Sequence, residues 1–287
     1  MLKQINPAAI KALALDLDGT SLLPDAVLGE RTRLCLKRLM SRGIQVIICT
    51  GRSIEASVRY YNEIGTRGPM VFFNGAEIAD VPDIKIIESN LLDIDVADYA
   101  IDLARNMDVH VQIFLPPENS AGEKNPPREA LLIDKIRPEA EMYRKHTGIN
   151  PVITDIKKAI TAPGLKGCVK AMFITDPALH DEIRQKMLAR FGDRIYVTRT
   201  HLTFLEVLGP GASKGKGLKT VMRHRGLKPE EVIAFGDEEN DLPMFTVAGF
   251  SGAPANAKEN IKQAADFVYG SNTEEGLAVF LEGLFAS

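Results

Sequence analysis

Residues 13–23 read LALDLDGTSLL, and this stretch decides the fold. Its apolar residues predict a buried β-strand over residues 10–17. Asp16 and Asp18 stand where that strand is expected to end, although a carboxylate is costly to bury without a compensating partner. Alternate residues of a strand point to the same face, with Cα atoms roughly 6.6 Å apart, so we expect both side chains to face one site.

The segments that follow alternate between helix and strand patterns. Residues 30–42 have apolar side chains at helical spacing, and a second helix is expected at 53–64. Residues 44–49 are almost wholly apolar and β-branched, as in a strand buried on both faces, and 70–74 form a further strand. This β-α-β-α-β order predicts a parallel sheet with right-handed crossovers.

The last third of the chain resumes this alternation and completes a Rossmann-like α/β core. We expect strands at 232–237, near Phe250 and at 267–269, and helices at 213–225, 239–247, 257–264 and 274–284.

The middle of the chain differs from both flanks and predicts an inserted α+β domain. We expect residues 1–83 and 209–287 to form the core, and residues 84–208 to form the insert. The sequence PPENSAGEKNPP at 116–127 is rich in proline and polar residues and predicts a loop. The other expected elements of the insert are helices at 92–107 and 177–191, strands at 109–115 and 168–174, and one or two strands within 195–208.

The composition shows no strong charge bias. The chain has 287 residues and a formal net charge of −3, which gives no footprint for nucleic-acid binding. No apolar run reaches the roughly 20 residues of a membrane-spanning helix, and we expect no signal peptide. The widely spaced Cys35, Cys49 and Cys168 suggest reduced thiols. We therefore expect a cytoplasmic protein, a monomer or weak homodimer, without nucleic-acid or membrane partners.

Polar clusters follow the expected parallel strands. In open α/β sheets ligands bind outside the carboxyl ends of the strands, so clusters remote in sequence should converge in space. The clusters are Asp16 with Asp18, residues 50–53 (TGRS), Asn74 with Gly75, and residues 236–241 (GDEEND).

This convergence gathers as many as four carboxylates, from Asp16, Asp18, Asp237 and Asp241. Like charges this close raise one another's pKa or require a cation, and such oxygen ligands suit Mg²⁺. Lys214 and Arg52 supply further positive charge, so the site suits phosphoryl transfer, which depends on positioning and charge neutralisation. A carboxylate that attacks phosphorus would form an aspartyl-phosphate and divide one difficult step into two.

Four short motifs, DLDGT (16–20), CTGR (49–52), SKGKGL (213–218) and GDEENDLPMF (236–245), occur in this order. Together they resemble the four motifs of the haloacid dehalogenase (HAD) superfamily of phosphohydrolases. The insert between the second and third motifs resembles the C2-type, class IIB cap of that superfamily. NGAEI at 74–78, NA at 256–257 and AADFVYGSNTEEGLAVFL at 264–281 resemble its Cof-type sugar-phosphatase branch.

The resemblance implies a role for each motif residue. Asp16 would be the nucleophile and Asp18 the general acid and base, while Thr50 would hold the phosphoryl group and Lys214 would neutralise charge. Mg²⁺ would be held by Asp16, the backbone carbonyl of Asp18, Asp237 and Asp241. Phosphate or substrate would contact Leu17, Gly51, Arg52, Asn74 and Asn240.

Two departures from the family pattern lie outside the implied catalytic positions. Ser21 stands where the family usually has leucine, and Ala253–Pro254 replaces a small–Met pair before Asn256. Simpler interpretations stay open for several motif residues. They are a structural turn for Asp16 and Asp18, a backbone hydrogen bond for Thr50, a charge at a helix N-terminus for Asp241, a structural ion pair for Arg52, and Lys216 or Lys219 in place of Lys214.

We therefore expect a Mg²⁺-dependent phosphatase acting on small phosphorylated metabolites, with sugar phosphates as the leading substrate class. An inserted domain over the site would exclude bulk water and disfavour folded-protein substrates. Two alternatives on the same core are a phosphosugar mutase and a sensor that binds a sugar phosphate without catalysis. A signalling receiver domain is disfavoured by the continuous DLDGT motif and by the insert.

Overall fold

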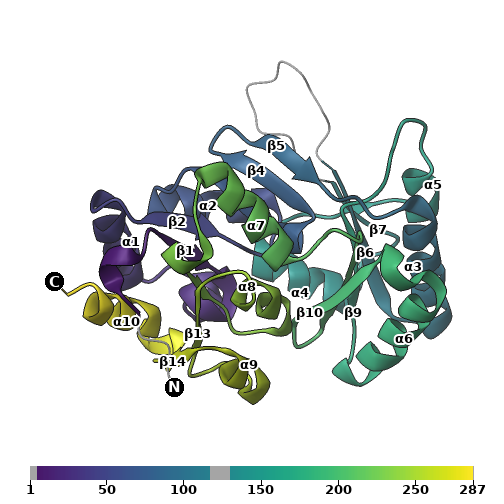
Figure 1. Cartoon of the computed structure of the whole chain (residues 1–287). Coiled ribbons are helices and arrows are strands. Elements are labelled where there is room, and N and C mark those ends of the chain that lie inside the picture. The colour runs from purple at the N-terminus through teal and green to yellow at the C-terminus, as the bar shows by residue number, and fades with distance from the viewer. Residues whose placement is uncertain (1–4, 117–129, 287) are drawn as a thin grey trace.

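The computed structural model describes residues 5–116 and 130–286 and is built around a five-stranded and a six-stranded sheet (Figure 1). The five-stranded sheet has the order β14-β13-β12-β1-β2, and every neighbouring pair is parallel. All of β1 is buried at the centre of this sheet, which explains its apolar sequence. The strands are β1 (Ala12–Leu15), β2 (Gln45–Ile48), β12 (Val232–Phe235), β13 (Phe250–Pro254) and β14 (Phe267–Tyr269).

Helices pack around this parallel sheet in two groups. Helix α1 contacts α2 and α10, whereas α7 contacts α8, which in turn contacts α9. The expected α/β core with a parallel sheet is therefore confirmed. The helices are α1 (Glu30–Ser41), α2 (Ile54–Ile64), α7 (Lys214–Arg225), α8 (Leu242–Phe245), α9 (Glu259–Ala264) and α10 (Gly276–Leu284).

The strand expected at 70–74 differs from its prediction. β3 (Gly68–Phe72) meets the parallel sheet through a single bridge between Cys49 and Val71, and it pairs antiparallel with β4 (Glu77–Val81). The strand ends at Phe72 because the next two residues have positive φ angles, a conformation incompatible with a strand.

A hairpin that the sequence analysis did not anticipate follows β3. β4 pairs antiparallel with β5 (Lys85–Ser89), and their turn contains residue 84, where we placed the start of the insert. The hairpin thus extends the β3 sheet across that boundary. The division into 1–83 with 209–287 and 84–208 stays a proposal.

The insert contains the six-stranded sheet, in the order β10-β11-β9-β6-β7-β8. All its pairs are antiparallel except β7 with β8. Figure 1 shows α3 and α6 on the side of this sheet away from the core. The elements are α3 (Ile94–Met107), β6 (His110–Leu115), β7 (Ala130–Ile133), α4 (Pro138–Thr147), β8 (Val152–Ile153), α5 (Ile156–Ile160), β9 (Lys170–Ile174), α6 (His180–Phe191), β10 (Tyr196–His201) and β11 (Phe204–Leu208).

The two faces of the insert's sheet serve different purposes. On β9, Phe173 packs among the apolar residues of α3 and α6, whereas Met172 belongs to the hydrophobic cluster of the core. Successive residues of a strand point to opposite faces, so Lys170 shares the core-facing side with Met172. The same alternation on β11 places Glu206 on the core-facing side with Phe204. The insert therefore presents two charged side chains toward the core.

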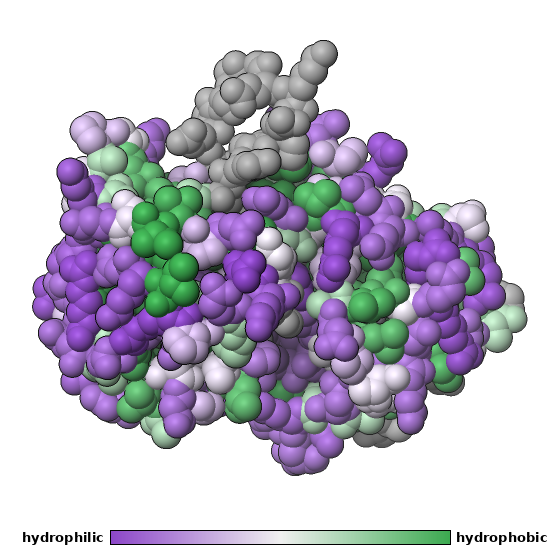
Figure 2. Space-filling view, turned by 180° about the vertical axis from the view of Figure 1, so that it is seen from behind, coloured by the Kyte–Doolittle hydropathy of each residue, from purple (hydrophilic) through white to green (hydrophobic). Residues whose placement is uncertain are grey.

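On the face shown in Figure 2, hydrophilic side chains predominate and apolar ones form separate groups, as is usual for a surface in water. Among the residues that the structure describes, no helix combines the length and apolar character needed to cross a bilayer. Residues 117–127 of the expected 116–127 loop lie outside the described residues.

Candidate active site

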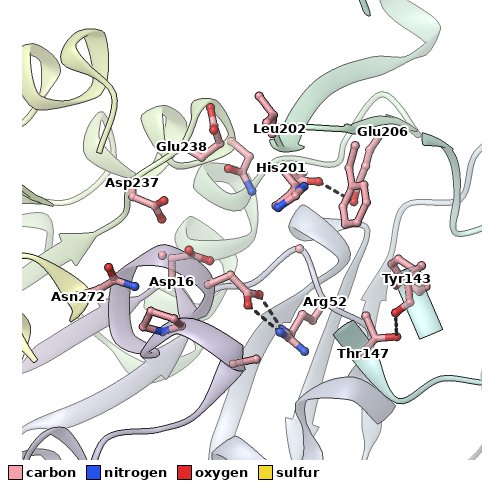
Figure 3. A pocket seen from close by; sticks show the side chains of 18 of the residues that line it. Asp16, Arg52, Tyr143, Thr147, His201, Leu202, Glu206, Asp237, Glu238 and Asn272 are labelled. Carbon is pink, nitrogen blue, oxygen red and sulfur yellow. Dashed lines mark hydrogen bonds and ion pairs between the residues drawn. The ribbon is translucent and has the colours of Figure 1, made fainter. Parts of the chain in front are cut away.

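A cavity of about 380 Å³ lies between the carboxyl end of β1 and the insert. Figure 3 shows Asp16 and Asp237 on one side of it, and His201 and Glu206 on the other. Residues 84–208, which we call the cap, and the flanking core segments both contribute to the walls. The core contributes Asp16, Asp18, Gly19, Gly51, Arg52, Asp237 and Asn240, and the cap contributes Tyr143, Lys170, Thr200, His201, Phe204 and Glu206, among others.

The turn after β1 sets the positions of the first acidic pair. β1 ends at Leu15, and residues 17–21 form a tight turn rather than more strand. The expectation that Asp16 and Asp18 share one face of a strand is therefore wrong, although both line the cavity. Gly19 has a φ of +73°, and a Cβ there would lie 2.2 Å from Asp237 Oδ2, so the turn requires glycine.

The side chains that follow Gly19 tie this turn to its surroundings. The Thr20 hydroxyl donates a 2.7 Å hydrogen bond to Asp237 Oδ1, which connects the first motif to the last. The buried Ser21 hydroxyl donates to the backbone carbonyl of Asp16 at 2.5 Å, a contact that leucine could not make. Ser21, a departure from the family pattern, therefore fixes the backbone at Asp16.

The other departure lies at the end of β13, where Ala253 and Pro254 pair with β14. Neither residue lines the cavity. The following Asn256 donates from Nδ2 to the carbonyl of Gly19 at 2.8 Å, so this segment supports the turn from outside. Nothing in the structure explains the choice of proline itself.

Lys214 lies between two of the predicted carboxylates. Its Nζ donates 2.6 Å hydrogen bonds to Asp16 Oδ1 and to Asp241 Oδ1, and all three side chains are buried. Asp241 Oδ2 also accepts the backbone N–H groups of Asp237 and Glu238, at 2.9 and 3.1 Å. Lys216 and Lys219 are exposed on the same helix, so the structure favours Lys214 among the three lysines.

The carboxylates outnumber this one ammonium group. Oxygen atoms of Asp16, Asp237 and Asp241 lie within 4.8 Å of one another. Burial raises the pKa of Asp16 well above its usual range, and burial with the nearby Asp241 raises the pKa of Asp237 to about 7. Burial opposes the charge on Lys214, but Asp16 and Asp241 outweigh it and raise the lysine's pKa. A cluster with this excess of negative charge suits a divalent cation with oxygen ligands.

Asp18 and Arg52 form an ion pair at the cavity wall, and Figure 3 labels Arg52. Arg52 Nε and one terminal nitrogen each donate to a different Asp18 oxygen, both at 2.6 Å. The guanidinium group also lies 5.3 Å from the centre of the Tyr60 ring. Arg52 therefore belongs both to a structural ion pair and to the cavity wall, and it holds the Asp18 carboxylate in place.

Thr50 and Leu17 lie behind the cavity wall, because both are buried and neither is among the residues that line it. Thr50 Oγ1 accepts the backbone N–H of Arg52 at 3.0 Å, and its carbonyl accepts the N–H of Asn74 at 3.0 Å. Accepting a hydrogen bond leaves the hydroxyl proton of Thr50 free to donate. Gly51, between Thr50 and Arg52, does line the cavity.

Two charged cap residues were missed by the sequence analysis. Lys170 and Glu206 are both almost completely buried, and Lys170 Nζ lies 2.7 Å from Glu206 Oε1. Lys170 also donates to the carbonyl of Gly51 at 3.2 Å and lies 4.8 Å from the centre of the Phe114 ring. A single charge within each of the short apolar runs KAMFI and FLEVL was the available signal.

Asn74 and Asn240, predicted at the edge of the phosphate site, form a chain with Glu206. Asn74 Nδ2 donates to Glu206 Oε2 at 2.8 Å, and Asn240 Nδ2 donates to Asn74 Oδ1 at 2.9 Å. This chain of hydrogen bonds runs from Glu206 on the cap, through Asn74 just after β3, to Asn240 in the GDEEND segment. It joins residues separated by up to 166 positions in the sequence.

Comparison with known proteins agrees with this geometry. The model of the haloacid dehalogenase-like hydrolase family matches residues 13–281. The chain belongs to this family. It is 28% identical to the 5-amino-6-(5-phospho-D-ribitylamino)uracil phosphatase YitU of Bacillus subtilis over 275 residues, which cover 96% of this chain and 97% of that protein.

Solved structures of HAD-like hydrolases share the whole fold. A haloacid dehalogenase-like hydrolase from Bacteroides thetaiotaomicron superimposes with a TM-score of 0.81 at 25% identity, covering 96% of this chain and all of that one. A subclass IIB sugar phosphatase superimposes with a TM-score of 0.76 at 22% identity, covering 96% and 100% of the two chains, and at this identity shows the fold alone.

The family resemblance and the enzyme class inferred from the four motifs are therefore confirmed. This HAD-like hydrolase is an enzyme of the phosphatase class. The structure brings Asp16, Lys214, Asp237 and Asp241 together, and places Asp18, Arg52, Gly51 and Asn240 around the same cavity.

Proposed function

We propose that this HAD-like hydrolase is a Mg²⁺-dependent phosphatase that hydrolyses small phosphorylated metabolites through an aspartyl-phosphate on Asp16. The observation that carries the proposal is the position of Asp16. Its carboxylate is held by Lys214 at 2.6 Å, beside Asp237, in a cavity covered by the cap. A buried and oriented carboxylate of this kind is suited to nucleophilic attack.

The acidic cluster supports a Mg²⁺ site. Both oxygens of Asp241 already accept hydrogen bonds, from Lys214 and from two backbone N–H groups. We therefore propose that Asp16, Asp237 and the backbone carbonyl of Asp18 hold the ion, with Asp241 in support. When bound, the ion would neutralise negative charge on the cluster and on the phosphate.

The remaining steps are assigned to protein groups. Asp16 attacks phosphorus while the bond to the leaving oxygen breaks. Asp18 donates the proton that this oxygen needs, which requires that Asp18 first take up a proton and release its ion pair with Arg52. Asp18 then takes a proton from water, whose oxygen attacks the phosphorus. The bond to Asp16 breaks, and inorganic phosphate leaves. Lys214 stays paired with Asp16, and the Thr50 hydroxyl and the Gly51 N–H are assigned to the phosphoryl group.

The size and walls of the cavity support a small, polar leaving group. A volume of about 380 Å³ suits a metabolite, and the cap closes it with Thr147, Thr200 and His201 among its polar groups. The similar Bacillus subtilis protein is named for a substrate with a phosphorylated ribityl chain. We therefore propose a sugar phosphate or a related polyol phosphate as the substrate. Buried, unpaired cysteines fit a reducing compartment, and we propose a cytoplasmic monomer or weak homodimer.

A panel of phosphorylated metabolites assayed for phosphate release, with and without Mg²⁺, tests this function. We expect release from sugar or polyol phosphates that depends on Mg²⁺ and needs no bisphosphate activator. Conversion of one sugar phosphate into another, dependent on such an activator, would instead support the mutase alternative. Binding of sugar phosphates without any turnover would support the sensor.

A further inference from the structure

We propose that Glu206, on the cap, is a positioning residue that fixes the orientation of the Asn240 side-chain amide in the phosphate site. This inference rests on the proposed function, because it concerns binding of the phosphoryl group. It assigns to the cap a role beyond covering the cavity. The cap would decide whether a core residue offers a hydrogen-bond donor or an acceptor to the phosphate.

Glu206 anchors a chain of hydrogen bonds that runs through Asn74 to Asn240. Glu206 is about 2% exposed, and its Oε1 accepts hydrogen bonds from Lys170 Nζ at 2.7 Å and from the Thr200 hydroxyl at 3.0 Å. A carboxylate paired with an ammonium group accepts hydrogen bonds and donates none. The other oxygen, Oε2, is therefore also an acceptor, and its partner must present a donor.

Asn74 provides the donor that Glu206 Oε2 requires. Its Nδ2 donates to Glu206 Oε2 at 2.8 Å, which leaves Oδ1 at the opposite end of the amide. Reversal would set Oδ1 against a carboxylate oxygen, so the orientation of Asn74 is fixed by charge. Gly51 also makes room for this amide, because a Cβ on Gly51 would lie 3.1 Å from Asn74 Nδ2 and Oδ1.

Asn240 is the next residue in the chain of hydrogen bonds, and it lines the cavity. Its Nδ2 donates one N–H to Asn74 Oδ1 at 2.9 Å, and an amide nitrogen carries a second N–H. Its buried Oδ1 has no hydrogen-bond partner among the residues described by the structure. The hydrogen bond to Asn74 is thus the contact that orients this amide.

The orientation matters because phosphate is an anion. With Nδ2 held by Asn74, the nitrogen end of Asn240 keeps a donor available for a phosphoryl oxygen. The reversed amide would place a carbonyl oxygen in the same position, where it would repel the phosphate. Asn74 and Asn240 belong to the core segments, whereas Glu206 and Lys170 belong to the cap strands β11 and β9. The donor is therefore set only when the cap is seated on the core.

A double-mutant cycle tests this chain of hydrogen bonds. We compare wild type, Glu206→Gln, Asn240→Ala and the double variant by calorimetric binding of inorganic phosphate in the presence of Mg²⁺. Gln can donate as well as accept, so E206Q keeps the side-chain size but loses the constraint on Asn74. We expect about tenfold weaker phosphate binding in each single variant, typical of one lost hydrogen bond to a charged group. The double variant should bind no more weakly than N240A.

Two further variants serve as controls for the double-mutant cycle. Asn74→Gly removes the intermediate amide yet accepts the positive φ of 56° at this position, so it should reproduce E206Q without altering the cap. Arg184→Gln removes another cap–core ion pair, with Glu239 at 2.8 Å, and should change binding by the same factor with or without Asn240. The proposal would be overturned if the double variant lost phosphate affinity by the product of the two single losses. It would also be overturned if N74G bound phosphate as tightly as wild type.

Phosphate binding and monoester hydrolysis are measured separately, so the role of Glu206 and the proposed function can fail independently. If wild type hydrolyses phosphate monoesters but the E206Q and N240A effects multiply, only the role of Glu206 fails. If wild type binds phosphate without hydrolysing any monoester while the cycle is non-additive, the proposed phosphatase reaction fails and the amide chain stands.

Discussion

Asp16 is the residue on which the proposed chemistry depends most directly. It shares Lys214 with Asp241, and burial raises its pKa. In Asp16→Asn the amide cannot attack phosphorus, so we expect turnover to fall at least about a thousandfold. The fold should persist because loss of one clustered carboxylate reduces repulsion. Phosphate release and the melting temperature are measured on one preparation; near-wild-type release from folded D16N would refute the nucleophile assignment.

Ser21 supports the backbone of that nucleophile. Ser21→Ala would leave the carbonyl of Asp16 without its 2.5 Å hydrogen bond, and we expect the free energy of unfolding to fall by about 1–2 kcal/mol. Ser41→Ala is the matched control, because its exposed hydroxyl makes a similar bond to the Arg38 carbonyl at 2.8 Å, which water can replace. Urea denaturation of both variants compares them. Equal losses would show that burial of the Ser21 contact is unimportant.

Single residues differ in how far their partners could be foreseen. The motifs located Asp16, Lys214 and Asp237, because each follows or begins an element whose end lies at one edge of a parallel sheet. The bond from Ser21 to Asp16 could not be foreseen, since it depends on a tight turn where a longer strand was expected. Glu206 could not be linked to Asn74 because 132 positions separate them in the sequence.

At the scale of elements, strand β6 contains a buried histidine that makes stability depend on pH. His110 lies at the start of β6, and burial lowers its pKa to about 4. An unfolded chain binds this proton near pH 6.5, whereas the folded protein does not until about pH 4. The contribution to stability is therefore present above about pH 6.5 and is lost as the pH falls toward about 4.

The variant His110→Gln isolates this contribution. Between about pH 6.5 and pH 4, the free energy of unfolding of wild type should fall relative to H110Q by on the order of 2–3 kcal/mol. The exposed His224 supplies the control, since His224→Gln should leave the wild-type slope unchanged. Denaturation curves at several pH values measure the differences. Parallel profiles for wild type and H110Q would exclude His110 as the source.

Many elements with a clear apolar pattern were predicted well, whereas a mostly polar helix and a hairpin were missed. The strands of the parallel sheet and helices α1, α3 and α7 match their expected positions within a few residues. Helix α4 was missed because its sequence, PEAEMYRKHT, is mostly polar and buries little more than Ala140 and Tyr143. The β4–β5 hairpin was missed because its pairing depends on β3 leaving the parallel sheet.

At the scale of the whole molecule, one cavity depends on segments that lie far apart in the sequence. The first and last motifs meet through Thr20 and Asp237, and the cap reaches the core through Lys170 and Glu206. The sequence indicated an insert between the second and third motifs, but not which face it would present. That face follows from strand alternation once β9 and β11 are seen to be neighbours. The direction in which the single charges of β9 and β11 point therefore became recognisable only in the folded structure.

The proposed Mg²⁺ site joins the two separate sequence halves of the core, since Asp16 and Asp237 belong to different halves. An ion bound there stabilises the folded molecule, because the unfolded chain cannot bring these carboxylates together. With free Mg²⁺ about 100-fold above its dissociation constant, we expect the free energy of unfolding to rise by about 2.7 kcal/mol. The gain should be largest above about pH 7 and decline as the pH falls below it, because protonation of Asp237, whose pKa is raised to about 7, competes with the ion.

Denaturation with MgCl₂, against NaCl of equal ionic strength, measures this gain. Asp237→Asn should remove most of it, since the variant loses one charged ligand and part of the repulsion that the ion relieves. Asp193→Asn, which changes an exposed carboxylate on the cap, should keep the full gain and so excludes a general effect of surface charge. An equal gain in D237N and wild type would place the ion elsewhere. Because folding is measured rather than turnover, the result tests the metal site independently of the substrate.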